Sequence, residues 1–224
     1  MPSIEGLRLK IRNQIYIPLT CKSRKNSLKN PTFTIISNNC WGGTVYEAYN
    51  LPKQSPTVGM FFMADDYLKF LSDLEGYLYG ILTFIAPEKS RWKDAPQVSG
   101  DRRFGSYPVG HLSNGKNTIE IFFLHYHSEQ EAREKWERRC KRMNWERMLV
   151  KFNDQNGCTS KNVQDFMRLP FKNKLFFTCK EWPGISEEYT VIRQVPKHDC
   201  IMASYEPFGK GKYVDITAVL NKLK

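Results

Sequence analysis

The sequence predicts an α/β fold: one domain with a mixed sheet and helices on both of its faces, preceded by a basic N-terminal arm. Three observations predict this class. Short runs of β-branched and aromatic residues alternate with stretches of helical periodicity. Asn114-Gly115 lies between two apolar runs and is a strong hairpin signal, which adds antiparallel pairing. Hydrophobic residues make up 41% of the 224 positions and charged residues 25%, which is typical of a globular chain and not of a disordered one.

The arm, residues 1–31, holds most of the excess positive charge. The chain has 34 Lys and Arg against 23 Asp and Glu, a formal net charge of +11, and the arm supplies seven bases and one acid. Within residues 3–16, four apolar side chains fall at helical spacing: Ile4, Leu7, Ile11 and Ile15. Two interpretations stay open, an amphipathic helix packed on the domain or an interfacial helix on an anionic membrane. Residues 22–31 are expected to be a polar linker.

The domain, residues 32–224, is expected to alternate strands with helices. Strands are predicted at 33–37, 108–112, 118–127, 148–152 and 174–179, and a strand or an extended run at 55–62. Helices are predicted after the Gly-Gly pair at 42–43, from Asp65 or Asp66, at 129–143, at 160–168 and after Asp215. The best-defined of them is 129–143, where Ser128 and Glu131 are spaced as a capping box. Residues 87–107 form a long polar loop, which is either mobile or functional.

Several classes of protein are excluded. No apolar run approaches the roughly 20 residues of a membrane-spanning helix, and no cleavable secretory signal is recognisable. We therefore expect a cytoplasmic protein, peripheral at the inner face of the membrane if the arm binds lipid. The six cysteines are scattered and are expected to be reduced thiols, with no disulfide framework and no metal site. The aromatic residues lie within apolar runs, so a nucleic acid is not an expected partner.

The sharpest local signal is SNNCWGG at residues 37–43. A strand that ends in small polar residues and runs into a helix presents backbone N–H groups at the carboxyl edge of the sheet, where α/β proteins bind ligands. The helix dipole would favour the thiolate of Cys40, the candidate nucleophile. The candidate oxyanion- or ligand-binding residues are Asn38, Asn39, Trp41, Gly42 and Gly43. The alternative is a tight structural turn with a buried tryptophan.

Four further groups of side chains are candidates for chemistry. His125 and His127 lie two apart in a predicted strand and would share one face, as a general base with a helper, although each could be structural. Asp66 could orient a histidine, but a helix cap explains it more simply. The candidate phosphate-binding residues are Arg138, Arg139 and Arg142, whose alternative is a solvated helix face. Basic residues within 91–103 could receive a phosphorylated donor instead.

Several long motifs in fixed order carry a resemblance to a known family. They are FTIISNNCWGG, LPKQSPTVGMFF, DDYLKFL, YPVGHL, FLHYHSEQEAREKWERRCKRMN and LPFKNKLFFT. Over roughly residues 33–180 the chain resembles a bacterial family of exopolysaccharide biosynthesis proteins, otherwise classed as a domain of unknown function. The resemblance implies a role in building capsule or exopolysaccharide beside the inner face of the membrane, and it supplies no established reaction.

The preferred hypothesis is a Cys-dependent acyl (acetyl) transferase acting on a sugar or lipid-linked saccharide intermediate. Cys40 would be the nucleophile and His125 or His127 the base, which is the equipment that acyl transfer needs. A coenzyme A thioester would be the donor, with no tightly bound cofactor. The first alternative is a glycosyl or phosphosugar transferase, in which the turn at 38–43 cradles the diphosphate of a sugar nucleotide. The second is a non-catalytic accessory protein of the polysaccharide assembly machinery.

Overall fold

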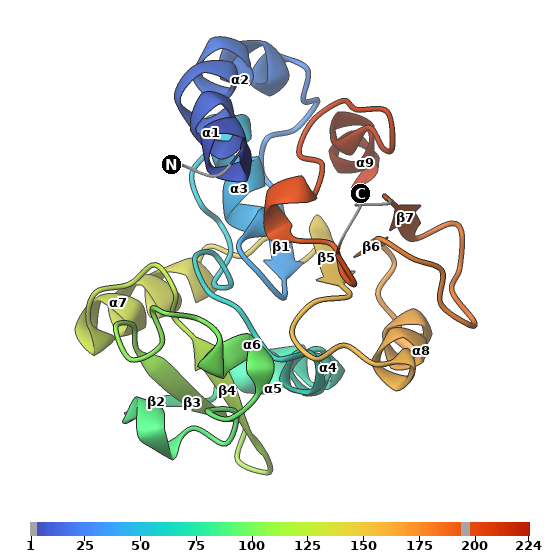
Figure 1. Cartoon of the computed structure of the whole chain (residues 1–224). Helices are drawn as coiled ribbons and strands as arrows, with labels where there is room; N and C mark the ends of the chain where they lie inside the picture. Colours follow the sequence, from blue (N-terminus) through green and yellow to red (C-terminus); the bar gives the residue numbers. More distant parts are fainter. Residues whose placement is uncertain (1–3, 194–197) are drawn as a thin grey trace.

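Two β-sheets organise the molecule in the computed structural model, which describes residues 4–193 and 198–224 (Figure 1). The first sheet has the order β1-β5-β6-β7 and is parallel throughout: β1 (Thr34–Ser37), β5 (Met148–Asn153), β6 (Lys174–Thr178) and β7 (Thr190–Ile192). The second is antiparallel: β2 (Ile81–Ile85), β3 (Val109–Ser113) and β4 (Thr118–Phe122). The predicted α/β class is confirmed, with parallel and antiparallel pairing divided between the two sheets.

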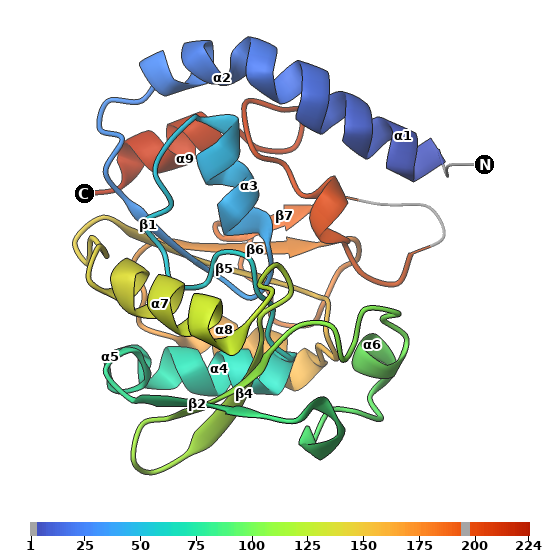
Figure 2. The same cartoon turned by 90° about the vertical axis from the view of Figure 1, so that its left-hand side faces the viewer.

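Helices cover both faces of the parallel sheet, as predicted (Figure 2). They are α1 (Ile4–Ile11), α2 (Ile17–Asn26), α3 (Trp41–Ala48), α4 (Ala64–Ser72), α5 (Leu74–Leu78), α6 (Pro96–Ser99), α7 (Glu129–Cys140), α8 (Ser160–Arg168) and α9 (Ile216–Lys222). Helices α3 and α9 lie on one face, and α4 and α8 lie on the other, with the antiparallel sheet beyond α4. Short 3₁₀ turns occupy Pro87–Lys89 and Ala203–Tyr205.

The central strands are buried on both faces because their apolar residues alternate in direction. Ile35 and Phe177 belong to the core under α3 and α9, whereas Ile36, Phe152 and Phe176 belong to the core under α4 and α8. Four parallel strands that are apolar on both faces have to lie between two layers of helices. The carboxyl ends of β1 and β5 therefore come to one edge of the sheet, where the loops that follow them meet.

The capping box predicted at Ser128 and Glu131 is formed, whereas α4 begins after Met63 and neither Asp65 nor Asp66 caps it. The Ser128 hydroxyl accepts a hydrogen bond from the Glu131 N–H at 3.1 Å, and the Glu131 carboxylate accepts from the His127 N–H at 2.8 Å. Helix α8 begins with a full capping box between Thr159 and Asn162. The predicted helix over 160–168 and the hairpin at Asn114-Gly115 are both confirmed.

One predicted strand is absent, and another is shorter than predicted. Residues 55–60 form turns, and of this segment Phe61 makes a single bridge to Phe122. The strand predicted over 118–127 ends at Phe122, and residues 124–125 turn back instead. Apolar and aromatic character alone predicted both strands, but at 55–60 the chain turns through Gly59 at a φ of +82°, a left-handed conformation that favours glycine.

The arm is helical for longer than predicted. Helix α1 continues through a π-helical turn, Arg12–Tyr16, into α2, so helix replaces the expected polar linker as far as Asn26. The arm crosses the domain above α3 and α9 (Figure 2), and Ile17 is buried in the core beneath it. Position 3, where the predicted helix starts, lies outside the described residues. The division of the chain at residues 31 and 32 stays a prediction.

Two buried carboxylates hold the start of the polar loop at 87–107. Asp66 pairs with the Arg91 guanidinium and accepts from Trp92 Nε1 at 2.7 Å. Glu120 accepts from the Arg91 N–H at 2.9 Å. The loop is thereby fixed over the antiparallel sheet, and its later part reaches the edge of the parallel sheet.

Candidate functional site

A buried ion pair lies under the carboxyl edge of the parallel sheet. Lys151, within β5, pairs with Glu206, and both side chains are fully buried. The Lys151 ammonium also donates to Asn39 Oδ1 at 3.0 Å. Burial lowers the pKa of Lys151 and raises that of Glu206, and the attraction between the two charges opposes both changes. Close contact with polar partners is what makes two such buried charges tolerable.

Three asparagines complete this network. Asn38 Nδ2 donates to Asn153 Oδ1 at 2.7 Å, and Asn153 Nδ2 donates to Glu206 Oε1 at 2.8 Å. The amide of Asn39 donates to both oxygens of Glu206 at 3.3 Å. Because the amides of Asn38 and Asn39 are engaged in this way, they shape the floor of the site, and their predicted role as oxyanion donors has no support in these contacts.

Two hollows of about 500 and 590 Å³ meet above the network. They share four lining residues: Cys40, Arg103, Ala203 and Ser204. The 87–107 loop walls the smaller hollow, and the arm walls the larger one, through Leu9, Arg12 and Asn13. Together they form a cleft centred on Cys40 that is large enough for a cofactor-sized ligand. Hereafter this is the Cys40 cleft.

Cys40 lies at the N-cap of α3, where the sequence places it. Its thiol donates to the Met60 carbonyl oxygen at 3.8 Å. Burial raises the pKa of Cys40 to about 12, and the positive charge of Arg103 opposes this only in part. The resting group is therefore a neutral thiol, in contrast to the thiolate that the helix dipole alone would predict. A reaction at this sulfur needs a base.

His125 is the histidine that reaches the Cys40 cleft. It is exposed on a turn at the rim of the larger hollow, beside Gly59. Partial burial and the positive charge of Arg103 lower the pKa of His125, so its ring is neutral near pH 7 and can accept a proton. Within the described chain, the hydrogen bond of the Cys40 thiol goes to Met60 and not to His125.

Replacing Arg103 by glutamine is expected to raise the pKa of His125 towards its ordinary value of about 6.5. The guanidinium disfavours the imidazolium, so removing it allows protonation at higher pH, while burial still holds the pKa down. A titration of the ring by NMR measures the midpoint. Arg102→Gln changes the neighbouring exposed arginine and should leave the midpoint unchanged. Equal midpoints in wild type and Arg103→Gln would show that the Arg103 charge does not reach the ring.

His127 and Asp66, two other predicted site residues, lie outside the Cys40 cleft. His127 is exposed at the start of α7, and because the predicted strand ends at Phe122 it does not share a strand face with His125. Asp66 is engaged by Arg91, Trp92 and the Glu120 N–H, and no contact joins it to either histidine among the described residues. The expectation that Asp66 orients a histidine is therefore wrong: its carboxylate holds the 87–107 loop.

The predicted phosphate clamp divides between two environments. Arg139 is buried, and its guanidinium donates to the Val58 carbonyl oxygen at 3.0 Å and to the Tyr126 hydroxyl. Arg138 is exposed on α7, and Arg142 is exposed in the turn that follows it. The clamp of three arginines is therefore wrong for Arg139, which ties α7 to the 55–60 turns.

The remaining residues of the SNNCWGG turn pack the helix against the sheet. Trp41 is fully buried, and its Nε1 donates to the Pro207 carbonyl oxygen at 2.6 Å. A Cβ at Gly42 would lie 3.3 Å from Ile35 Cγ2 in β1, and one at Gly43 would lie 3.1 Å from Val58 Cγ1. The structural alternative therefore accounts for Trp41 and Gly42, while Gly43 also lines the Cys40 cleft.

Sequence reasoning missed Lys151, Asn153 and Glu206. One signal was available: a lysine inside the apolar run MLVKF, in a strand expected to be buried on both faces, requires a buried partner. The partner could not be named, because Glu206 reaches Lys151 from a distant irregular segment. Among the described residues, no group of three or more His, Cys, Asp or Glu side chains is arranged to hold a metal ion. No helix in the described ranges combines the length and apolar character needed to cross a bilayer.

Fold and site define an α/β protein with a ligand-sized cleft at the carboxyl edge of a parallel sheet, around a cysteine over a buried Lys–Glu pair. Residues 11–223 match the family described as a domain of unknown function, DUF1919, and the chain belongs to that family. It is similar to a Haemophilus influenzae protein named "Uncharacterized protein". The two are 36% identical over 170 residues, which span 76% of this chain and 73% of the relative.

Proposed function

We propose that this protein transfers an acyl group through Cys40 to a sugar or lipid-linked saccharide in cell-surface polysaccharide assembly. The observation that carries the proposal is that Cys40 and His125 line one hollow, with Arg103 lining it beside them. A neutral thiol and a neutral imidazole suit general-base activation at the moment of attack, in place of a standing thiolate. The polysaccharide context rests on the resemblance of residues 33–180.

The chemistry would proceed in two balanced steps. His125 takes the proton of Cys40 as the sulfur attacks the carbonyl carbon of an acyl thioester, and the donor's thiolate leaves with that proton. A sugar hydroxyl then attacks the acyl-cysteine, its proton passes to His125, and the thiol of Cys40 is restored. Arg103 would bind the phosphates of a coenzyme A donor. For this, its ion pair with Asp101, at 2.9 Å, has to break. Side-chain motion from Cys40 or His125 would complete their contact.

The test is to trap the acyl-enzyme. Wild-type protein incubated with acetyl-coenzyme A should gain one acetyl group on Cys40, released by neutral hydroxylamine as a thioester is. Cys40→Ala should gain none, and His125→Gln should acylate at least about 100-fold more slowly, the usual effect of losing a general base. Cys140→Ala, which removes a thiol remote from the Cys40 cleft, is the matched control and should behave as wild type. No adduct in the wild type, or an equal adduct in Cys40→Ala, would reject the proposal.

A glycosyl or phosphosugar transferase is the second candidate, and the position of the Cys40 cleft favours it. Open α/β sheets bind nucleotides beyond the carboxyl ends of their strands, and the N-terminus of α3 points into this edge. Binding of a sugar nucleotide that raises the thermal midpoint equally in wild type and Cys40→Ser would select it. Substitutions at Gly42 or Gly43 would not discriminate, because both glycines are needed for packing. If neither acetyl-coenzyme A nor a sugar nucleotide binds, the result would favour the non-catalytic accessory role.

A further inference from the structure

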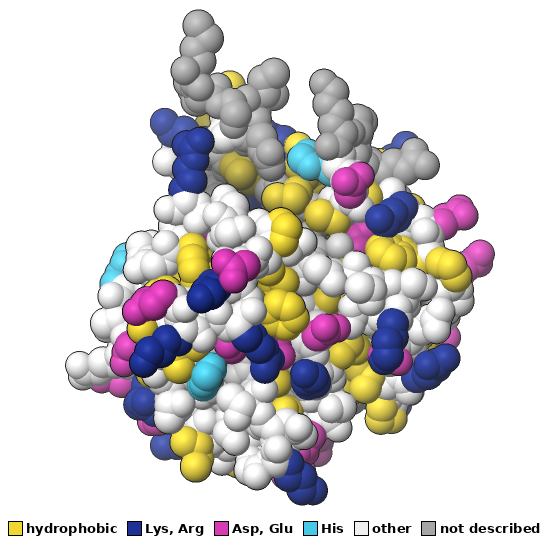
Figure 3. Space-filling view, turned by 60° about the horizontal axis from the view of Figure 1, so that its bottom comes forward, with side chains coloured by type: hydrophobic (Ala, Val, Ile, Leu, Met, Phe, Trp, Pro, Cys, Tyr) yellow, Lys and Arg dark blue, Asp and Glu magenta, His cyan; other side chains and the backbone are white. Residues whose placement is uncertain are grey.

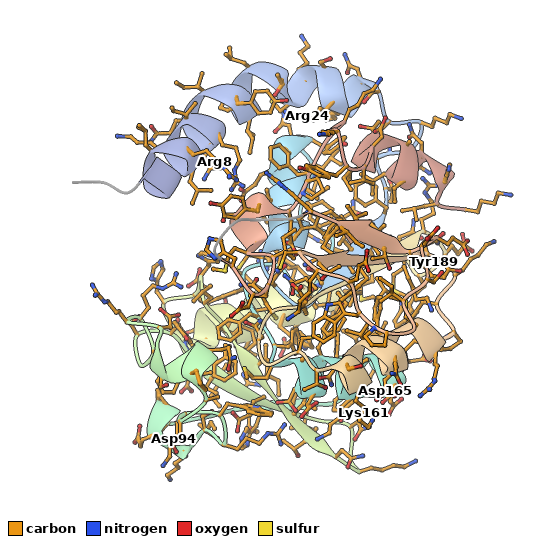
Figure 4. The ribbon with its side chains drawn as sticks, turned by 45° about the vertical axis from the view of Figure 1, so that its right-hand side comes forward. Arg8, Arg24, Asp94, Lys161, Asp165 and Tyr189 are labelled. Carbon is orange, nitrogen blue, oxygen red and sulfur yellow. The ribbon has the colours of Figure 1, made fainter. Side chains whose placement is uncertain are left out.

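The arginines of the N-terminal arm contact the domain, whereas its lysines are exposed to solvent. Arg8 and Arg12 donate to the Ser204 carbonyl oxygen at 2.6 and 3.1 Å, and Arg24 donates to the Ala48 carbonyl oxygen at 2.9 Å. Figure 4 shows Arg8 and Arg24 on the side of the arm that faces the domain. The arm's lysines, in contrast, are all exposed: Lys10, Lys22, Lys25 and Lys29. The arginines therefore fasten the arm, and the lysines remain in solvent.

Aromatic side chains of the C-terminal segment complete this attachment. The Arg8 guanidinium stacks over the Tyr205 ring at 4.1 Å, and that of Arg24 lies 5.3 Å from the Phe208 ring centre. Tyr16 packs edge-on against Phe208. The arm is thus held to the domain mainly through polar and cation–π contacts and Ile17, and most of its described apolar side chains lie outside the core.

Four of these side chains form one stripe along the outer side of the arm. They are Leu7, Ile11, Ile15 and Leu19, which are 53, 47, 54 and 78% exposed. Their spacing of four residues, carried through the π-helical turn, keeps them on a single face. Four large aliphatic side chains in a row make a continuous apolar surface, which on a folded protein marks a contact site.

Basic residues dominate the charge of the arm, and Glu5 is its one acidic residue. No acidic residue occurs between Glu5 and Glu47, so the exposed lysines of this arm have no acidic neighbour in sequence. The side of the molecule that carries the antiparallel sheet is different, since Figure 3 shows charges of both signs interspersed there. An apolar stripe bordered by lysines is complementary to a surface that is apolar beneath a layer of negative charge. An anionic lipid bilayer is such a surface.

We propose that the outer face of the arm, Leu7 to Lys25, docks the protein on a bilayer that contains anionic lipid. Leu7, Ile11, Ile15 and Leu19 enter the boundary between headgroups and acyl chains, and the lysines contact the lipid phosphates. Since Leu9, Arg12 and Asn13 line the Cys40 cleft, docking brings this wall of the cleft within about one helix diameter, about 10 Å, of the membrane surface. The proposal does not depend on which reaction the cleft performs.

Flotation of the full chain with phosphatidylcholine vesicles, with and without phosphatidylglycerol, tests the proposal. The wild type is expected to float with the anionic vesicles and not with pure phosphatidylcholine. Ile15→Gln/Leu19→Gln should weaken binding at least about tenfold, because both side chains lose their transfer into the apolar layer. Lys22→Gln/Lys25→Gln should weaken it by a factor of about five for each charge, and added salt should have the same effect.

The control is an equally exposed apolar pair elsewhere, Tyr79→Ser/Ile81→Gln, whose side chains are 74 and 71% exposed in the wild type. This variant should float as the wild type does. Thermal melting confirms that every variant is folded. No flotation of the wild type, equal flotation with pure phosphatidylcholine, or equal flotation of Ile15→Gln/Leu19→Gln would overturn the proposal. A dimer that this variant abolishes, without vesicle binding, would overturn it in favour of a second copy of the chain.

Discussion

Lys151→Met is expected to lower the free energy of unfolding by about 3–5 kcal/mol, the usual cost of removing one partner of a buried ion pair. The substitution leaves Glu206 fully buried without its cation, and Asn39 loses the ammonium that it accepts from. Methionine fills a volume similar to the lysine stem, so the loss comes from the uncompensated carboxylate and not from a cavity. Urea denaturation followed by circular dichroism measures the change.

A second variant separates charge from packing. Lys151→Met/Glu206→Gln removes both charges and keeps a side-chain oxygen for Asn39 and Asn153, so it should recover more than half of the loss. Lys161→Met breaks the exposed pair with Asp165 and should stay within about 0.5 kcal/mol of wild type. A Lys151→Met protein as stable as wild type would mean that Glu206 is protonated and that the two groups are not an ion pair.

Asp66→Ala is expected to cost about 3 kcal/mol, since it leaves three donors without their acceptor. These are the Arg91 guanidinium, the Trp92 Nε1–H and the buried Glu120 N–H at 3.1 Å. Arg91 is partly exposed and can be hydrated, so most of the loss comes from the other two. The loop at 87–107 is also expected to become more accessible to protease, because Asp66 is one of the two carboxylates that hold it.

The neighbouring aspartate is a matched control for this prediction. Asp65 is exposed and accepts a single hydrogen bond, from Asn162 Nδ2 at 2.7 Å, so Asp65→Ala should cost no more than about 1 kcal/mol. Equal losses in the two variants would show that burial of Asp66 does not decide its contribution. Loss of stability without faster cleavage of the loop would show that the loop is held by other contacts.

Local patterns in the sequence predicted the elements whose stability is local. The cap and the apolar periodicity of the helix over 160–168 lie within ten residues of one another. The turn of the hairpin is specified by two residues, Asn114 and Gly115. The strands at 34–37, 148–153 and 174–178 are recognisable because burial on both faces favours a nearly continuous apolar run. Cys40 follows the first of these strands, and clefts of α/β proteins form at the carboxyl ends of parallel strands, so its position beside a cleft could also be predicted.

The parts that could not be predicted depend on contacts distant in sequence. Phe123 and Tyr126 are as apolar as strand residues, but their places in the core are reached through a turn, and this moved His127 away from His125. Glu206, the partner of Lys151, is 55 positions further along the chain, and no local sequence pattern indicates that its carboxylate is buried. The arm illustrates a third case: its periodicity predicted a helix, but which face meets the domain is decided by aromatic residues near the other terminus.

The pairing of β1 with β5 also has a consequence for how the chain acquires its structure. Thr34 lies opposite Met148, so the first strand to leave the ribosome has to wait for the whole antiparallel sheet to be synthesised before its neighbour exists. The hairpin of β3 and β4 closes over a short loop, whereas the parallel pair must close a loop of more than a hundred residues, at a larger cost in chain entropy. During that interval the apolar run at 34–36 has no strand partner, which leaves it open to pairing with other chains.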